Sequence, residues 1–444
     1  MTRIPPRSNP GTPPRRAPSP AARPAGRQAP ASAVDDVFAF EAGGLPVLFQ
    51  PNRAHEVVAA RLYVRGGATN LDAATAGAEL MYARAARRGT RRYPKQRLNA
   101  ELARLGAELG TGVAEDYSVF NLRCLRRHFG TAWDLLTDVV LQPLLEPAEV
   151  EVVRQQMLLE IRQLRDNPDA WLEELARERC YAGHPYAPNP SGAEPAVSKL
   201  DPELLRGHMQ RHLARSNLLL VVVGDLEREE LEPLAASVAR DLSQGSGPPP
   251  RPPALRFPTA SLAVEARALP TNYVLGQFAA PAPGDADHVA ALLALSVLRD
   301  RFFEEVRTKR NLSYAPSAGL GHSAANLGSI YVTAVDPVTT LGVMRDEMRR
   351  LQQDLMEPKD LQDKVRVFVT RYHIQNETSH ALAGFLASYE LLAGGWRQSR
   401  EFVPRLEALR PADVQLAAQG ILRHIQYIFL GDPARADPRI FVDP

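Results

Sequence analysis

Two side chains that could stabilise a developing negative charge, Arg307 and Tyr314, lie seven positions apart in the second half of the chain. A guanidinium fork and a phenol hydroxyl are hydrogen-bond donors of the kind that stabilise an oxyanion during attack on a carbonyl. On a continuous helix, residues seven apart share one face. If the helix ends between them, the pair can still converge across the turn. The alternative is that Arg307 pairs with Glu304 or Glu305 on a solvated face, and that Tyr314 lies at the rim of a sheet.

A segment of the first half resembles a metal-binding helix but lacks the metal ligands. Residues 77–90 read Gly-Ala-Glu-Leu-Met-Tyr-Ala-Arg-Ala-Ala-Arg-Arg-Gly-Thr. This resembles the zinc-site helix of the insulinase/pitrilysin (M16) metallopeptidases, whose pattern is Gly-Leu-Ala-His-x-x-Glu-His followed by Gly-Thr. The two histidine positions then fall on Leu80 and Arg84, and the glutamate position falls on Ala83.

The resemblance also places the third zinc ligand of the family, a glutamate on a later helix. It stands seven positions before the glutamate of a Glu-Ile pair, and counting back from Glu160 gives Val153. A catalytic zinc needs three protein ligands and an open position for water, while the glutamate of the motif acts as general base. The aliphatic replacements have no donor atom, and the permanently charged Arg84 would repel a dication. We therefore expect this chain to bind no zinc and no other cofactor.

Further segments match the family in order and spacing over about residues 37–432. They are Glu-Ile at 160–161 with Asp-Asn-Pro at 166–168, Gly-His-Pro-Tyr at 183–186, Val-Val-Val-Gly-Asp at 221–225, and Val-Arg-Thr-Lys-x-x-Leu-x-Tyr at 306–314. The resemblance implies that a peptide substrate pairs with a strand edge within residues 107–119. The family usually has Asn-Ala in that strand, whereas this chain has Gly110, Thr111 and Gly112. Glycine lets a backbone approach closely but weakens a strand.

Composition restricts the class of protein. The 444 residues are 45% hydrophobic, which allows more than one core, and 53 basic against 51 acidic residues give a net charge of +2. This balance offers no argument for nucleic-acid binding. The two cysteines, Cys124 and Cys180, cannot form a disulfide framework. Because we find neither a run of ~18 apolar residues nor a secretory signal, we expect a soluble, cytoplasmic protein with no membrane span.

Composition and periodicity predict two folded halves. Residues 1–34, with nine prolines, six arginines and no acidic residue, are predicted to be disordered. The halves are 35–242, with the degenerate zinc site, and 255–444, with the arginine–tyrosine pair, joined by a Gly/Pro-rich linker at 243–254. Strands are predicted at 57–64 and 273–278 to open the halves and at 218–225 and 427–432 to close them, with helices at 148–165, 288–309 and 341–372.

These patterns predict an α+β fold in which helices pack on one face of a largely antiparallel sheet. The resemblance implies two homologous M16-type halves arranged as a clamshell around a chamber. It also implies that Arg307 and Tyr314 contact the substrate carbonyl at a zinc held elsewhere. A chain with this pair and no zinc ligands is similar to the non-catalytic subunit of two-chain M16 peptidases.

We therefore expect that this chain has no enzymatic activity by itself. It would form a heterodimer with a homologous zinc-bearing subunit, and Arg307 and Tyr314 would act at the partner's zinc during peptide hydrolysis. The alternative is a zinc-free structural or peptide-binding scaffold, which could be a homodimer.

Overall fold

The first half is built on a six-stranded sheet. The computed structural model describes residues 36–444, so the tail predicted to be disordered, 1–34, lies outside the described residues. The strands are β1 (Phe38–Ala42), β2 (Leu45–Pro51), β3 (Val57–Arg65), β4 (Glu108–Val113), β5 (Tyr117–Leu125) and β6 (Leu218–Gly224), in the order β1-β2-β6-β3-β5-β4. Neighbouring strands are antiparallel except β2 and β6, which are parallel. This arrangement makes β4 one edge of the sheet.

The second half has a five-stranded sheet with a related design. Its strands are β7 (Ser261–Ala266), β8 (Asn272–Ala279), β9 (Ser317–Leu320), β10 (Leu327–Ala334) and β11 (Gln426–Gly431), in the order β7-β11-β8-β10-β9. Only β7 and β11 are parallel neighbours. In both sheets, therefore, the last strand of the half lies in the interior of the sheet, beside one parallel and one antiparallel neighbour.

Helices surround both sheets. In the first half they are α1 (Ala78–Ala86), α2 (Lys95–Leu105), α3 (Phe129–Leu141), α4 (Pro147–Leu164), α5 (Pro168–Cys180), α6 (Glu194–Val197), α7 (Pro202–His212) and α8 (Arg228–Arg240). In the second half they are α9 (His288–Phe302), followed directly by a π-helical turn (Phe303–Thr308), α10 (Pro337–Gln353), α11 (Pro358–Gln375), α12 (Ser379–Leu392), α13 (Phe402–Glu407) and α14 (Pro411–Ile421). Short 3-10 turns lie at Gly67–Asn70, Arg126–His128, Arg215–Asn217, Trp396–Glu401 and Pro433–Arg435.

Strand β6 explains how the first sheet is covered. Its six apolar residues run without a break and are all buried, and side chains alternate between the two faces of a strand. Leu220 and Val222 enter the core formed with α1, α3, α4, α7 and α8, whereas Leu219 and Val221 enter a separate cluster on the opposite face. A continuous apolar strand therefore marks a sheet buried on both sides.

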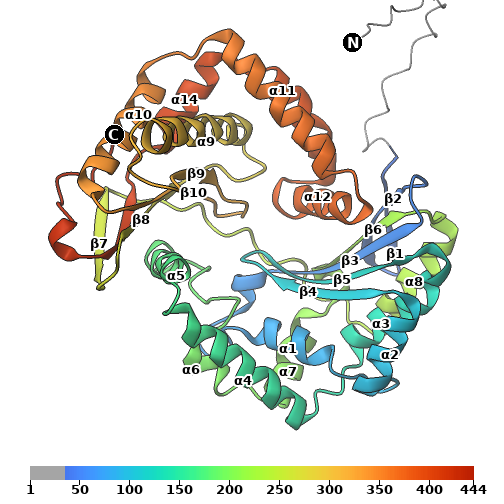
Figure 1. Ribbon diagram of the computed structural model, residues 1–444. Helices are drawn as coiled ribbons and strands as arrows, with labels where there is room; N and C mark the ends of the chain where they lie inside the picture. Colours follow the sequence, from blue (N-terminus) through green and yellow to red (C-terminus); the bar gives the residue numbers. More distant parts are fainter. Residues whose placement is uncertain (1–35) are drawn as a thin grey trace, which may run out of the picture.

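The opposite face of each sheet is covered by a helix from the other half. Leu382 and Leu386 of α12 pack on the first sheet, and Leu172 of α5 packs on the second sheet against β8 and β11. Figure 1 shows α12 lying over β3 and β6. A hydrogen bond between Arg61 of β3 and His380 of α12 joins the same surfaces. The two halves are thus interlocked by an exchange of helices.

Three details correct the sequence-based elements. The helix predicted over 341–372 is two helices, α10 and α11, because the chain is extended at Asp354 and Pro358 begins a new helix. Strands β1 and β2 precede the strand predicted to open the first half, and a turn through Gly43 and Gly44, at φ of 60° and 84°, joins them. In the second half β7 precedes β8. Among residues 36–444 no helix has the length and apolar content needed to cross a lipid bilayer.

Candidate functional site

Apolar side chains occupy two of the three positions that the resemblance assigns to zinc ligands, and an arginine occupies the third. Helix α1 carries Leu80, Ala83 and Arg84, and the neighbouring α4 carries Val153. Ala83 and Val153 are each 1% exposed within the main core of this half, and Leu80 packs against that core. Zinc does not fit here, because hydrocarbon side chains have no lone pair to donate. Across the described residues, no cluster of three or more His, Cys, Asp or Glu side chains is placed to hold a metal ion.

An ion pair joins α1 to α4 beside these residues. The Nη1 atom of Arg84 donates to both carboxylate oxygens of Glu160, at 3.0 and 2.8 Å. The Arg84 side chain is 31% exposed and that of Glu160 is 56% exposed, so the pair contributes at most about 1 kcal/mol to stability. Helices α1 and α4 are therefore held together mainly by the buried apolar residues.

Arg307 lies in the π-helical turn that follows α9 and contacts two aromatic rings. Its guanidinium carbon is 4.7 Å from the centre of the Phe303 ring and 4.2 Å from the centre of the Tyr314 ring. Exposed cation–π contacts of this kind stabilise by about 0.5–1 kcal/mol each. Single π-helical turns are frequent at functional sites. The structure thus brings together the two residues that the sequence singled out.

The predicted alternative for Arg307, an ion pair with Glu304 or Glu305, is wrong. Both carboxylates face other cations: Lys309 lies 2.7 Å from Glu305 and 3.9 Å from Glu304, and the adjacent arginine, at 310, also binds Glu305. The two hydrogen bonds on Glu305 lower the pKa of its carboxyl to about 2. Within the part of the chain that the structure describes, the Arg307 guanidinium makes no ion pair and donates no side-chain hydrogen bond.

Tyr314 occupies a loop, and neither the helix nor the strand considered for it from the sequence. The chain reverses at Asn311, which has a φ of 50°, and the N–H of Leu312 donates to the carbonyl of Val306 at 2.9 Å. The loop reaches β9 only at Ser317. Tyr314 is 76% exposed. The turn therefore returns the exposed phenol ring to the guanidinium of the half-buried Arg307.

The segment predicted to receive a peptide contains the edge strand β4. Residues 107–119 include all of β4 and the start of β5, so the predicted strand is a hairpin. β4 pairs with β5 on one side, and in the described structure no strand pairs with its other side, where Gly110, Thr111 and Gly112 lie. A methyl group at Gly110 would meet Asn121 at 3.7 Å, and one at Gly112 would meet Val119 at 3.4 Å. Packing therefore leaves room for a side chain at both glycines.

Family models match both halves of the chain. The family model "Insulinase (Peptidase family M16)" matches residues 47–190, and the model "Peptidase M16 inactive domain" matches residues 199–367. The chain belongs to the M16 peptidase family. The first match contains Leu80, Ala83, Arg84 and Val153, and the second contains Arg307 and Tyr314.

Individual M16 relatives are distant. An uncharacterised zinc protease of Streptomyces coelicolor is 21% identical over 355 residues, covering 76% of each chain. Subunit 1 of the mouse mitochondrial cytochrome b-c1 complex is 24% identical over 219 residues, covering 48% of this chain and 44% of that protein. The crystal structure of a peptidase M16 inactive domain from Pseudomonas fluorescens has a TM-score of 0.82 and 22% identity, covering 89% of this chain and 98% of that chain. That structural likeness establishes the fold.

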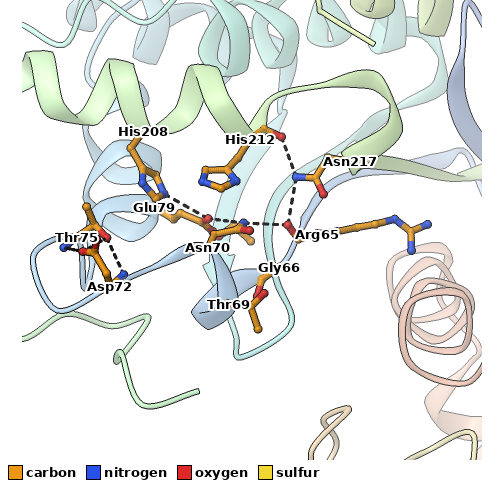
Figure 2. Close-up of polar contacts among 11 residues, drawn as sticks. Arg65, Gly66, Thr69, Asn70, Asp72, Thr75, Glu79, His208, His212 and Asn217 are labelled. Atoms are coloured by element: carbon orange, nitrogen blue, oxygen red, sulfur yellow. Dashed lines mark hydrogen bonds and ion pairs between the residues drawn. The ribbon is translucent and has the colours of Figure 1, made fainter. Parts of the chain in front are cut away.

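A buried polar cluster beside the degenerate M16 motif was not predicted. Glu79, which stands where the family pattern reads alanine, is 2% exposed and accepts hydrogen bonds from Asn70 at 2.9 Å and from Ser118. The Nε2 atom of His208 on α7 lies 3.6 Å from Glu79, and His212 lies one turn further along α7 (Figure 2). Burial and the neighbouring His208 lower the pKa of His212. The local signal that could have predicted this cluster is Glu79 itself, an acidic residue among the largely apolar buried residues of α1.

Proposed function

We propose that this chain is the non-catalytic subunit of a heterodimeric M16 zinc peptidase. It would present Arg307 and Tyr314 to the zinc site of a homologous partner subunit, which would hydrolyse peptides. The observation that carries this proposal is the half-buried Arg307 guanidinium, which contacts two aromatic rings and has no acidic partner among the described residues. Leu80, Arg84 and Val153, at the expected zinc-ligand positions of the same chain, have no lone pair to donate to zinc, which supports the need for a second subunit.

The environment of Arg307 suits binding of a developing oxyanion. The rings of Phe303 and Tyr314 restrict the guanidinium without occupying its N–H donors, since they contact it through their π electrons. The Tyr314 hydroxyl adds a neutral donor on the same loop. Preorganised donors of this kind stabilise the charge that forms on a substrate carbonyl when zinc-bound water attacks it. The partner would supply the zinc and the general base.

The proposal is tested by mixing the chain with a homologous zinc-bearing M16 subunit and measuring cleavage of a fluorogenic peptide. Arg307→Met, which keeps the apolar stem, should lower kcat by on the order of 10² to 10³, and Tyr314→Phe should also lower it. Arg310→Met is the matched control, because Glu305 already neutralises Arg310. Sedimentation velocity should show that all variants still pair with the partner. Unchanged cleavage by Arg307→Met and Tyr314→Phe complexes would refute the proposed role.

A second candidate is a zinc-free M16 scaffold that holds a complex together or binds peptide without hydrolysis. The partial similarity to subunit 1 of the cytochrome b-c1 complex, a component of a larger assembly by its name, favours this reading. Light scattering on the isolated chain, with and without the zinc-bearing homologue, separates the two. A stable homodimer that ignores the homologue supports the scaffold, and a one-to-one complex with it supports the heterodimer.

A further inference from the structure

Arg65 is a half-buried cation whose guanidinium has no direct partner among the described residues. It is the last residue of β3, and its carbonyl accepts hydrogen bonds from Asn70 and Asn217. Figure 2 shows its side chain extending away from the Glu79 cluster. Within residues 36–444 its guanidinium makes no hydrogen bond or ion pair, and burial lowers its pKa, an effect that the charge of Glu390 partly offsets. The N–H donors of this half-buried guanidinium are therefore free to bind acceptor oxygens of a ligand.

The guanidinium borders a cavity at the junction of the two halves. The cavity has a volume of about 240 Å³ and lies between the end of β3, the end of α12 and the chain segment 248–252. This segment, Pro-Pro-Pro-Arg-Pro, contributes an apolar wall, which Leu391 extends. Small-molecule sites are frequent at such junctions between domains, where apolar walls meet a few polar groups.

Two carboxylates also line this cavity. One oxygen of Glu390 accepts the backbone N–H of Trp396 at 2.9 Å. Asp116 accepts hydrogen bonds from the Tyr186 hydroxyl and from the backbone N–H of Ala324, the latter at 3.2 Å. The second cation of the cavity, at 251, lies 3.5 Å from the carboxylate of Asp285. One unpartnered cation, two carboxylates and an apolar wall therefore face the same small space.

We propose that this cavity binds a small amino-acid zwitterion with an apolar side chain, a free amino acid or a dipeptide. The ligand carboxylate would form a forked pair with Arg65, the geometry that guanidinium groups favour. The ligand ammonium would lie against Glu390, and its side chain would pack on the proline wall. A simple anion fits less well, because the two carboxylates would repel it. This inference is independent of the proposed role of Arg307 and Tyr314.

Isothermal titration calorimetry on the full chain at pH 7 tests the proposal with three probes. Leucine carries both charges, N-acetylleucine carries only the carboxylate, and leucinamide carries only the ammonium. We expect leucine to bind at least about tenfold more tightly than either analogue, since each loses one charge-assisted hydrogen bond. Glycine should bind more weakly than leucine, because it lacks the apolar contact. Equal binding of N-acetylleucine, or no binding of leucine at millimolar concentration, would overturn the proposal.

Two variants assign the contacts. Arg65→Met keeps the apolar stem and should weaken leucine binding at least about tenfold, whereas Arg53→Met, at an exposed ion pair outside the cavity, should not change it. Glu390→Gln can still accept the Trp396 N–H but removes the charge, so it should weaken leucine binding and leave N-acetylleucine binding no weaker. Circular dichroism identifies any variant that fails to fold. Leucine affinity unchanged in folded Arg65→Met protein would refute the site.

Discussion

Substituting one of two adjacent valines on α4 tests whether the expected third zinc-ligand position, Val153, is part of the core. Val153 is 1% exposed, whereas Val152 is 41% exposed. Val153→Glu removes a buried apolar side chain, which costs about 1.5–3 kcal/mol. It also requires the new carboxyl to be held neutral at pH 7, and moving its pKa from about 4.3 to above 7 costs roughly 4 kcal/mol more.

We therefore expect Val153→Glu to lower the free energy of unfolding by about 5–7 kcal/mol, and Val152→Glu to change it by less than about 1 kcal/mol. The free energy is measured by urea denaturation followed by circular dichroism. A loss of that size is comparable with the whole stability of many domains, so Val153→Glu protein can be partly unfolded in buffer. Equal urea midpoints for the two variants would show that Val153 is not packed between α1 and α4 as described.

Adding two histidines to the same variant tests whether α1 and α4 still have the spacing of a zinc site. The triple variant Leu80→His, Arg84→His and Val153→Glu supplies two histidines one helical turn apart and a carboxylate from α4, the ligand set of a catalytic zinc. Zinc at 100 times its dissociation constant should raise the free energy of unfolding of this variant by about 2.7 kcal/mol and leave that of the unmodified chain unchanged. No stabilisation would mean that α1 and α4 have moved from the spacing that a metal requires.

Three further predictions concern the contact between the halves, each measured by urea denaturation. Leu386 of α12 is fully buried against the first sheet, so Leu386→Ala should cost about 2–5 kcal/mol, whereas Leu416→Ala, at a position that is 63% exposed, should cost less than about 0.5 kcal/mol. A methyl group at Gly384 would lie 2.7 Å from the Arg61 guanidinium, so Gly384→Ala should cost about 1 kcal/mol by displacing the hydrogen bond to His380, and the cost should disappear in an Arg61→Met background. Burial and the Arg61 charge lower the pKa of His380 from 6.5 to about 4. Between pH 6.5 and 4 the unfolded chain therefore binds a proton at His380 that the native state does not bind, so the free energy of unfolding falls as the pH drops through this range. His380→Gln should remove roughly 1–3 kcal/mol of that fall.

Local patterns in the sequence predicted much of the fold. The unbroken apolar run of β6 predicted a strand close to that of the structure, because a strand buried on both faces needs apolar residues at every position. The spacing of Arg307 and Tyr314 predicted that the two would meet. The backbone between them forms a π-helical turn and then reverses at Asn311. This path depends on backbone hydrogen bonds, which the residue types of the segment do not predict.

Contacts between distant segments could not be predicted in the same way. Leu382 and Leu386 predict an apolar stripe on α12, but a stripe does not indicate which sheet it will cover. The burial of Glu79 could not be predicted for the same reason, because its partners Ser118 and His208 come from distant segments, β5 and α7. The hydrogen bonds that make a buried carboxylate tolerable are supplied by tertiary structure and leave no local signal.

The exchange of α5 and α12 determines which movements the molecule can make. Separating the halves would expose Leu172, Leu382 and Leu386 and the sheet residues beneath them, at a cost on the order of 1.5–3 kcal/mol for each large side chain. The linker at 243–254 joins halves that are already held by these contacts, so it cannot act as a free hinge. The halves of this chain therefore move as one body. If the proposed heterodimer exists, a peptide must enter its shared chamber through motion between the two subunits, and a covalent cross-link between α12 and the first sheet should leave hydrolysis unchanged.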